Sequence, residues 1–316
     1  MIEQLMKNAS EAYYSGQPIL TNEQYDALEK IHGQIISGNG EVPHAYRMYS
    51  LKKHYEKDGP TPLNLANCVG SDKLDGAAVS ILYVDGELVY ALTRGDGVKG
   101  NFVTSKIAHL GIPEAINLGG VVQITGEVVA RKDVENSRNY ASGALNLKDM
   151  SQYYQRVRDG SMVFVAYNIQ IREDYWGIAD DYMADLDIIE NLGFKHIKQK
   201  DWHDDYPIDG QVYRLNNTAA FNAAGFTDRF PKGAYALKEE QEGVETTLLD
   251  VQWQTGKSGK VTPIAILEPV VIGEANVSRA TLNNMAFIEA LNLEIGCRVS
   301  VIRSGEIIPC IVARVD

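Results

Sequence analysis

Apolar and polar residues alternate with different periods in three stretches of the chain. Near the N-terminus, apolar residues recur at helical spacing over 2–13 and again over 25–35. Between 73 and 167 they form runs of strand length, separated by turns that contain glycine and aspartate. Over 247–316 short strands alternate with turns, and one helix is expected at about 282–291. The pattern predicts an α+β protein that begins with a helical hairpin.

The charge-rich segment 239–243 is the clearest boundary between domains. We expect a helical cap at 1–40, a larger domain at 41–243 and a small domain at 244–316. Several short strands and one helix within fewer than ~80 residues suit a closed β-barrel of the OB type. In the cap, a Thr-x-x-Gln capping box at 21–24 predicts the start of the second helix.

Cysteine usage and charge restrict the class of protein. Cys68, Cys297 and Cys310 lie far apart in the sequence, so they predict neither a disulfide framework nor a zinc site. The sequence has neither a signal-peptide pattern nor an apolar run of membrane-spanning length, so we expect a cytoplasmic protein with no membrane partner. The net charge of −12 argues weakly against attraction of nucleic acid by bulk charge, but it allows a basic groove on an acidic body.

The hairpin that follows Lys73 carries the strongest chemical signal. Asp75-Gly76 precedes an apolar strand, and Asp85-Gly86 supplies the two positive φ angles that a type I′ hairpin turn needs. The returning strand ends at Arg94, so this arginine should lie at the same end of the hairpin as Lys73. A lysine, an arginine and aspartates at one strand end suit a site that handles phosphate groups.

Three more charged residues fall in predicted strands. Glu127 interrupts an apolar run, which costs free energy unless the carboxyl faces a cavity or a partner. Each charge alone would suit a solvated surface or a salt bridge. Lysine is a weak nucleophile at its ordinary pKa of about 10.4, and nearby cations lower that pKa. Arg214 and Lys238 would supply such cations and neutralise charge on phosphorus, with Mg²⁺ held largely through water.

The order of these motifs resembles the adenylation domain of NAD-dependent DNA ligases, and the resemblance runs over nearly the whole chain. The stretches 262–270, 277–284 and 303–309 resemble the OB region of the same enzymes. The central motifs are Lys73-Leu74-Asp75-Gly76, Thr93-Arg94-Gly95-Asp96-Gly97, Gly126-Glu127-Val128-Val129, Asn136-Ser137-Arg138-Asn139 and Asp209-Gly210. The resemblance implies an ATP-grasp-like nucleotidyltransferase domain with an antiparallel sheet, an N-terminal helical cap that binds nicotinamide mononucleotide, and a C-terminal OB-fold barrel.

The resemblance implies a DNA ligase reaction of three steps. Lys73 would attack the α-phosphorus of the co-substrate NAD, release nicotinamide mononucleotide and retain AMP. AMP would then pass to the 5′-phosphate at a nick in double-stranded DNA. The 3′-hydroxyl would finally displace AMP and seal the strand, with Mg²⁺ as the metal.

The resemblance also assigns roles to individual residues. Asp75 and Glu127 would serve the ribose and the waters of Mg²⁺, and Arg94 would contact the ribose. Arg214 and Lys238 would hold the α-phosphate, and Tyr167 would stack on adenine. The other nucleotide-binding residues would be Tyr13, Tyr14, Asn22, Tyr25 and Asp26 in the cap, and Ser50, Leu51, Ser71 and Val212 in the central domain. The DNA contacts would come from Arg138, Asn146 and Arg279.

Several positions depart from the family pattern. Ser71 replaces a glutamate that contacts adenine, Arg214 replaces a lysine and Asn146 replaces an arginine. Further departures are Gly233 for tryptophan and, in the cap, Tyr14 and Asn22 for histidine and aspartate. We expect the chain to lack the zinc finger, helix–hairpin–helix and BRCT segments of the family. We therefore expect a compact ligase, or the adenylating subunit of a split ligase whose second subunit carries those segments.

Two other functions remain open at this point. One is an ATP-dependent nucleotidyltransferase that acts on RNA ends or caps, which shares the lysine core but lacks the helical cap. The other is a catalytically weakened subunit that binds DNA or helps assembly, which the changes at Ser71, Asn146 and Arg214 would suit.

Overall fold

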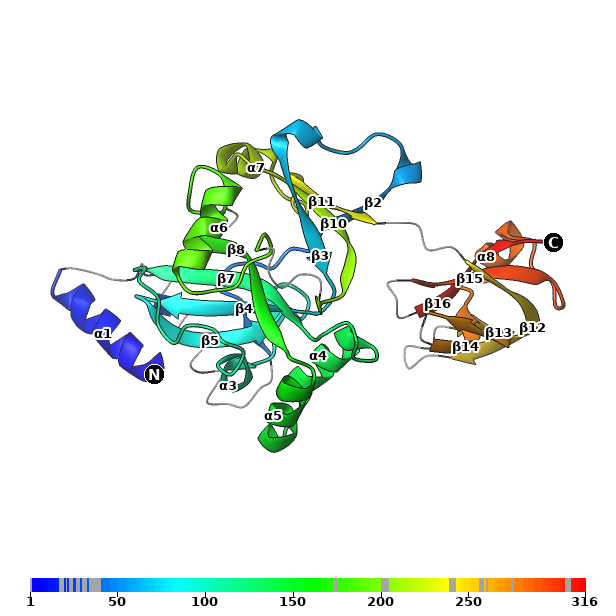
Figure 1. Cartoon of the computed structure of the whole chain (residues 1–316), viewed down its shortest axis with the longest axis horizontal. Helices are drawn as coiled ribbons and strands as arrows, with labels where there is room; N and C mark the ends of the chain where they lie inside the picture. Colours follow the sequence, from blue (N-terminus) through cyan, green and yellow to red (C-terminus); the bar gives the residue numbers. More distant parts are fainter. Residues whose placement is uncertain are drawn as a thin grey trace. The chain divides into compact units, whose positions relative to one another are not determined.

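The computed structural model describes residues 2–16, 20, 22, 25–26, 29, 33, 41–172, 175–199, 205–238, 243–255, 259, 261–273, 275–304 and 308–316. The chain divides into two compact units, Met1–Glu239 and Glu240–Asp316 (Figure 1). Each unit has its own hydrophobic core. The three-part division at 1–40, 41–243 and 244–316 stays a prediction. None of the helices among the described residues is long and apolar enough to cross a membrane.

A five-stranded antiparallel sheet forms the centre of the first unit. Alternate residues of β4 enter two different apolar clusters: Val79 and Ile81 contribute to the larger one, and Leu82 and Val84 to the smaller one. Because successive side chains of a strand point to opposite faces, this sheet is covered on both sides. The strands lie in the order β5 (Glu87–Thr93), β4 (Ala77–Val84), β7 (Val121–Val129), β8 (Val163–Arg172) and β9 (Tyr175–Trp176).

A four-stranded sheet meets the first sheet where the chain passes from β3 (Cys68–Leu74) to β4. A Cβ atom at Gly76 would lie 2.2 Å from the carbonyl oxygen of Val128, so only glycine allows this close passage beside β7. Lys73 therefore lies near the end of one sheet, beside the other. The strand order is β2 (Lys52–Tyr55), β11 (Ala234–Lys238), β10 (Ile208–Leu215) and β3 (Cys68–Leu74), with β2 parallel to β11.

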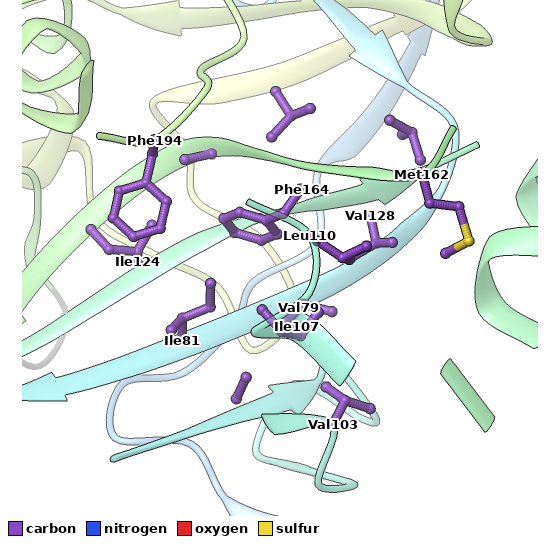
Figure 2. Close-up of a cluster of buried hydrophobic side chains, with 14 of the residues drawn as sticks. Val79, Ile81, Val103, Ile107, Leu110, Ile124, Val128, Met162, Phe164 and Phe194 are labelled. Carbon is purple, nitrogen blue, oxygen red and sulfur yellow. The ribbon is translucent and has the colours of Figure 1, made fainter. Parts of the chain in front are cut away.

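Helices and short segments complete the first unit around the larger core, part of which Figure 2 shows. Helix α6 begins after Asp181, whose side chain accepts a hydrogen bond from the amide of Ala184. Helix α6 spans Tyr182–Asn191. The other elements are α3 (Thr104–Ile107), α4 (Ser137–Asn146), α5 (Met150–Asp159), α7 (Thr218–Ala224), β1 (Val42–Pro43), β6 (Lys99–Gly100) and the 3₁₀ turns Glu56–Asp58 and Leu65–Asn67.

The N-terminal segment forms helix α1 (Ile2–Tyr14). Ala9 is buried in the smaller core with Leu20 and Val42, so this segment packs on the face of the sheet opposite the larger core. Thr21 and Gln24, the two capping residues of the predicted box, lie outside the described residues.

The second unit is a closed five-stranded barrel with one short helix, α8 (Met285–Ala290), among its described residues. Its core includes Leu248, Leu267, Val299 and Ile311. This is the small β-barrel that the strand spacing predicts. The strands close in the order β12 (Val244–Thr255), β13 (Val261–Ile272), β14 (Ala275–Thr281), β16 (Ile308–Arg314) and β15 (Arg298–Ser304).

Candidate active site

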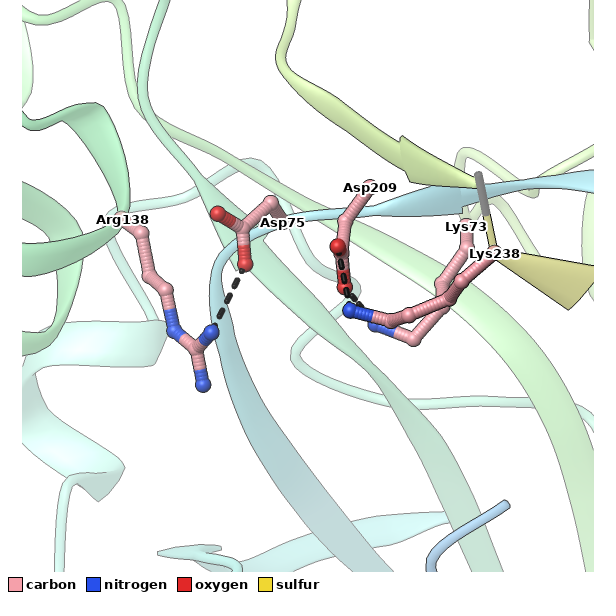
Figure 3. Close-up of polar contacts among 5 residues, drawn as sticks. All are labelled: Lys73, Asp75, Arg138, Asp209 and Lys238. Carbon is pink, nitrogen blue, oxygen red and sulfur yellow. Dashed lines mark hydrogen bonds and ion pairs between the residues drawn. The ribbon is translucent and has the colours of Figure 1, made fainter. Parts of the chain in front are cut away.

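Lys73 lies near the end of β3 and forms an ion pair with Asp209 of β10. The distance from Lys73 Nζ to Asp209 Oδ2 is 2.7 Å, and the other carboxylate oxygen of Asp209 accepts from Lys238 of β11 (Figure 3). Burial alone would raise the pKa of Asp209, but the charges of Lys73 and Lys238 hold it below its ordinary value. One buried carboxylate therefore joins the candidate nucleophile to the lysine predicted to hold the α-phosphate.

Asp75 begins a second ion pair two residues after Lys73. Its Oδ1 lies 3.2 Å from Nη1 of Arg138 on α4, and only 9% of its side chain is exposed (Figure 3). The amide of Asp75 also donates to the carbonyl of Pro207 at 2.9 Å, which ties this turn to the segment before β10. Arg138 thus stands at the rim of the site, with about a third of its side chain in solvent.

Glu127 is a partly buried carboxyl of β7, where it pairs with Ala78 across the sheet. Burial raises the pKa of Glu127 to about 7, while the charges of Lys73 and Arg94 oppose this rise. The negative charge of Asp75 raises the pKa of Glu127 further, and the positive charge of Arg138 lowers it. These four charged side chains and Glu127 therefore share one electrostatic environment.

Replacing Glu127 with glutamine should stabilise the fold at pH 8 and change its stability little at pH 5. The folded carboxyl has a pKa of about 7, above its ordinary value of 4.5, so the folded state binds the extra proton between these values. Wild-type stability should therefore fall as pH rises from about 4.5 to 7, by about 1–3 kcal/mol. Glutamine mimics the protonated acid and escapes this loss. Urea unfolding at both pH values measures the effect, and an equal difference at pH 5 and pH 8 would contradict it.

Tyr167 lies on β8 beside Glu127 and Arg94, whose charges act on its phenol. Its backbone carbonyl accepts a hydrogen bond from the hydroxyl of Tyr182, the first residue of α6, at 3.0 Å. Ser71 and Val212 are direct partners in the β3–β10 register, so these two predicted pocket residues lie side by side. The adenine-stacking role of Tyr167 stays a prediction.

Arg214 lies in a buried aromatic cage. Its Cζ is 4.1 Å from the ring centre of Tyr182 and 4.4 Å from that of Phe221, and its Nη1 donates to Asn168 at 3.0 Å. Only 4% of Arg214 is exposed, and among the described residues no carboxylate forms an ion pair with it. The predicted contact of Arg214 with the α-phosphate stays a prediction, and this geometry favours a role in packing instead.

The remaining predicted residues lie at several places. Ser50 donates its amide to the carbonyl of Arg229, and Leu51 packs in a small apolar cluster with Trp176. In the cap, Tyr25 is half-buried, whereas Tyr13, Tyr14, Asn22 and Asp26 are exposed. The side-chain amide of Asn146 donates to the backbone carbonyl of Ser142 within α4. In the second unit, Arg279 of β14 donates to Gln252 at 3.0 Å.

Asp209 is the member of this site that sequence reasoning did not select. Asp209-Gly210 contributes to the family resemblance, but nothing in its spacing shows that it pairs with Lys73, 136 residues earlier. One signal was available: Asp209 lies at the start of β10, and the neighbouring strand β11 ends at Lys238.

Comparison with known proteins agrees with this architecture. Residues 37–205 match the NAD-dependent DNA ligase adenylation domain, and 245–316 match the NAD-dependent DNA ligase OB-fold domain. Among solved structures, one of the Lig E DNA ligases, described as binding DNA with a minimal scaffold, has a TM-score of 0.52 at 15% identity and covers 84% of this chain and 98% of its own. That likeness confirms the fold: a ligase-type nucleotidyltransferase domain and an OB barrel.

Curated relatives show the family. DNA ligase 1 of Nocardia farcinica is 32% identical over 96% of this chain, and the DNA ligase of Clostridium novyi is 30% identical over the whole of it. The chain belongs to the NAD-dependent DNA ligase family. It spans about half the length of these relatives, 53% of the first and 58% of the second.

Proposed function

We propose that this chain forms a covalent lysine–AMP adduct with NAD and uses it to seal nicks in DNA. The observation that carries the proposal is the position of Lys73: its amine lies in a cluster of paired charges where two sheets meet, within an adenylation domain of the NAD-dependent family. Such a cluster can bind a dinucleotide phosphate because cations and carboxylates are already placed around it.

In the first step, the unprotonated amine of Lys73 attacks the α-phosphorus of NAD. A P–N bond forms, the bond to the bridging pyrophosphate oxygen breaks, nicotinamide mononucleotide leaves with the electron pair, and the attacking nitrogen releases a proton to water. In the structure Asp209 accepts a hydrogen bond from Lys73, so this carboxylate orients the amine before attack. Lys238, held by the same carboxylate, offers a positive charge for the oxygens of the reacting phosphate.

The site also suits Mg²⁺ held through water. Asp75 and Glu127 are close enough for the charge of Asp75 to raise the pKa of Glu127, and carboxylate oxygens are the ligands that Mg²⁺ prefers. The metal would supply positive charge to neutralise the phosphate oxygens during displacement. Among the described residues no three acidic, histidine or cysteine side chains form a group that could hold a metal ion directly.

The second and third steps need nicked double-stranded DNA. Arg138, at the rim of the site, is placed to meet the 5′-phosphate once Asp75 releases it. Arg279 of the barrel would contact the DNA backbone. A second subunit that carries further DNA-binding segments is compatible with this proposal.

Intact mass spectrometry tests the first step. The purified chain is incubated with NAD or with ATP, in the presence of Mg²⁺, and the mass of one added AMP is sought. We expect the adduct with NAD. An adduct with ATP alone would contradict NAD dependence, and no adduct with either nucleotide would favour a catalytically weakened subunit. Sealing of a nicked duplex by the isolated chain then shows whether a second subunit is required.

Replacing Arg138 with alanine should reduce the salt dependence of binding to nicked DNA. Each phosphate contact contributes about 0.9 to the slope of log K against log salt concentration, so the slope should become shallower by about that amount. Arg131, an exposed arginine that pairs with Asp133, provides the matched control. Equal slopes for the Arg138→Ala and Arg131→Ala variants would contradict a phosphate contact of Arg138. The isolated wild-type chain should itself show a shallow slope, because the proposal gives it only two phosphate contacts, at Arg138 and Arg279.

A further inference from the structure

A buried histidine connects the segment before β2 to the loop that carries Arg94. His44 Nδ1 lies 2.8 Å from Ser80 Oγ on β4, and His44 Nε2 lies 3.0 Å from the carbonyl oxygen of Arg94. His44 is 8% exposed and Ser80 only 1%, so water does not compete for these bonds. Neither residue belongs to the motifs that carry the family resemblance.

The partners determine which nitrogen carries the proton. A carbonyl oxygen only accepts, so Nε2 must donate to Arg94, and Nδ1 of a neutral ring is then the acceptor for the hydroxyl of Ser80. Burial lowers the pKa of His44 below its ordinary value, although the hydrogen bond to Arg94 and the charge of Asp96 oppose this. The neutral ring is therefore the form that fits this position.

The backbone of Arg94 is held from two sides. Its amide donates to the carbonyl of Ala78 at 2.9 Å, and its carbonyl accepts from the amide of Gly97 as well as from His44. A Cβ atom at Gly100 would lie 1.7 Å from the carbonyl oxygen of Thr93, so only glycine allows the backbone to pass this close, and the His44 ring lies in tight contact with the same position at 3.3 Å. The side chain of Arg94 reaches the environment of Glu127.

We propose that His44 is a positioning residue that fixes the backbone of Arg94, so that its guanidinium meets the nucleotide in one orientation. Ser80 orients the ring by donating to Nδ1, and the ring in turn donates to the Arg94 carbonyl. This inference rests on the proposed function, because it needs Arg94 to contact the nucleotide.

Two conservative variants separate this role from simple core filling. The side-chain amide of glutamine reaches the position of Nε2 and can still donate to the Arg94 carbonyl, whereas the shorter asparagine reaches only the position of Nδ1. We expect His44→Asn to lower kcat/KM for NAD in lysine–AMP formation about tenfold, mainly by raising KM. The reason is that a small displacement of a group that positions the substrate costs rate by factors of this size. His44→Gln should stay within about threefold of the wild type.

A double-mutant cycle with Arg94→Ala tests whether His44 acts through Arg94. In that background His44→Asn should cost less than about twofold, since the group that it positions is gone. Equal losses for the asparagine and glutamine variants, or a full tenfold loss in the Arg94→Ala background, would overturn the proposal. Thermal unfolding of each variant shows whether lost stability explains lost rate. Absence of any adduct in the wild-type chain would instead contradict the proposed function.

Discussion

The Lys73→Arg variant should form no AMP adduct with NAD while it keeps the wild-type fold. Arginine retains the positive charge beside Asp209, so the buried carboxylate keeps a partner and the ion pair that joins β3 to β10 is preserved. The guanidinium is protonated at every accessible pH, however, and has no free electron pair to attack phosphorus. The adduct should therefore fall below detection in intact mass spectra, and sealing of nicked DNA should be lost with it.

Two controls show whether the loss of the adduct is specific to Lys73 and to the first step. Lys53→Arg changes an exposed lysine on β2 and should leave adduct formation unchanged. If the Lys73→Arg variant is supplied with nicked DNA that already carries AMP on its 5′-phosphate, it should still seal the strand, because Lys73 is the nucleophile only in the first step. An adduct of normal yield in Lys73→Arg would place the nucleophile elsewhere.

Replacing Arg214 with alanine should lower the free energy of unfolding by about 2–4 kcal/mol. The guanidinium fills the space between the rings of Tyr182 and Phe221, and it donates to Asn168 on the strand that carries Tyr167. Alanine would leave a cavity in this aromatic cage and an amide oxygen without its donor. Urea denaturation measures the loss.

Arg214→Met distinguishes packing from phosphate binding. Methionine is similar in length and stacks between rings, and it removes a buried cation whose Nε and Nη2 have no hydrogen-bond partner in the described part of the chain. Its unfolding free energy should lie within about 1.5 kcal/mol of the wild type. The rate of AMP transfer to Lys73 should then stay within about fivefold, whereas loss of a phosphate ligand would cost about a hundredfold or more. If the Arg214→Met variant is stable but its rate of AMP transfer falls about a hundredfold, the result would support the phosphate contact that the sequence predicts.

Arg94 and Arg214 show which parts of the site can be predicted from the sequence and which cannot. Arg94 follows a hairpin whose turn, Asp85-Gly86, has positive φ angles of 47° and 85°, so its position at the Lys73 end of the hairpin was predictable from local chemistry. Arg214 lies in a strand, at the distance from Asp209 along the sequence that the family pattern has, and that spacing alone predicts that Arg214 belongs to the site. The aromatic residues that surround Arg214 come from α6 and α7, and their approach to β10 follows no local rule.

The sequence by itself determined the class of fold, the family and the identity of the candidate nucleophile. Apolar periodicity and turn residues act over a few positions, so they specify strands, helices and the small barrel without knowledge of the rest of the chain. The tertiary structure decided which charges meet. Asp209 joins Lys73 to Lys238 because β10 lies between β3 and β11, and His44 reaches Arg94 because β1 pairs with β6. Pairing between strands far apart in sequence depends on the packing of the whole domain, and no short stretch of residues encodes it.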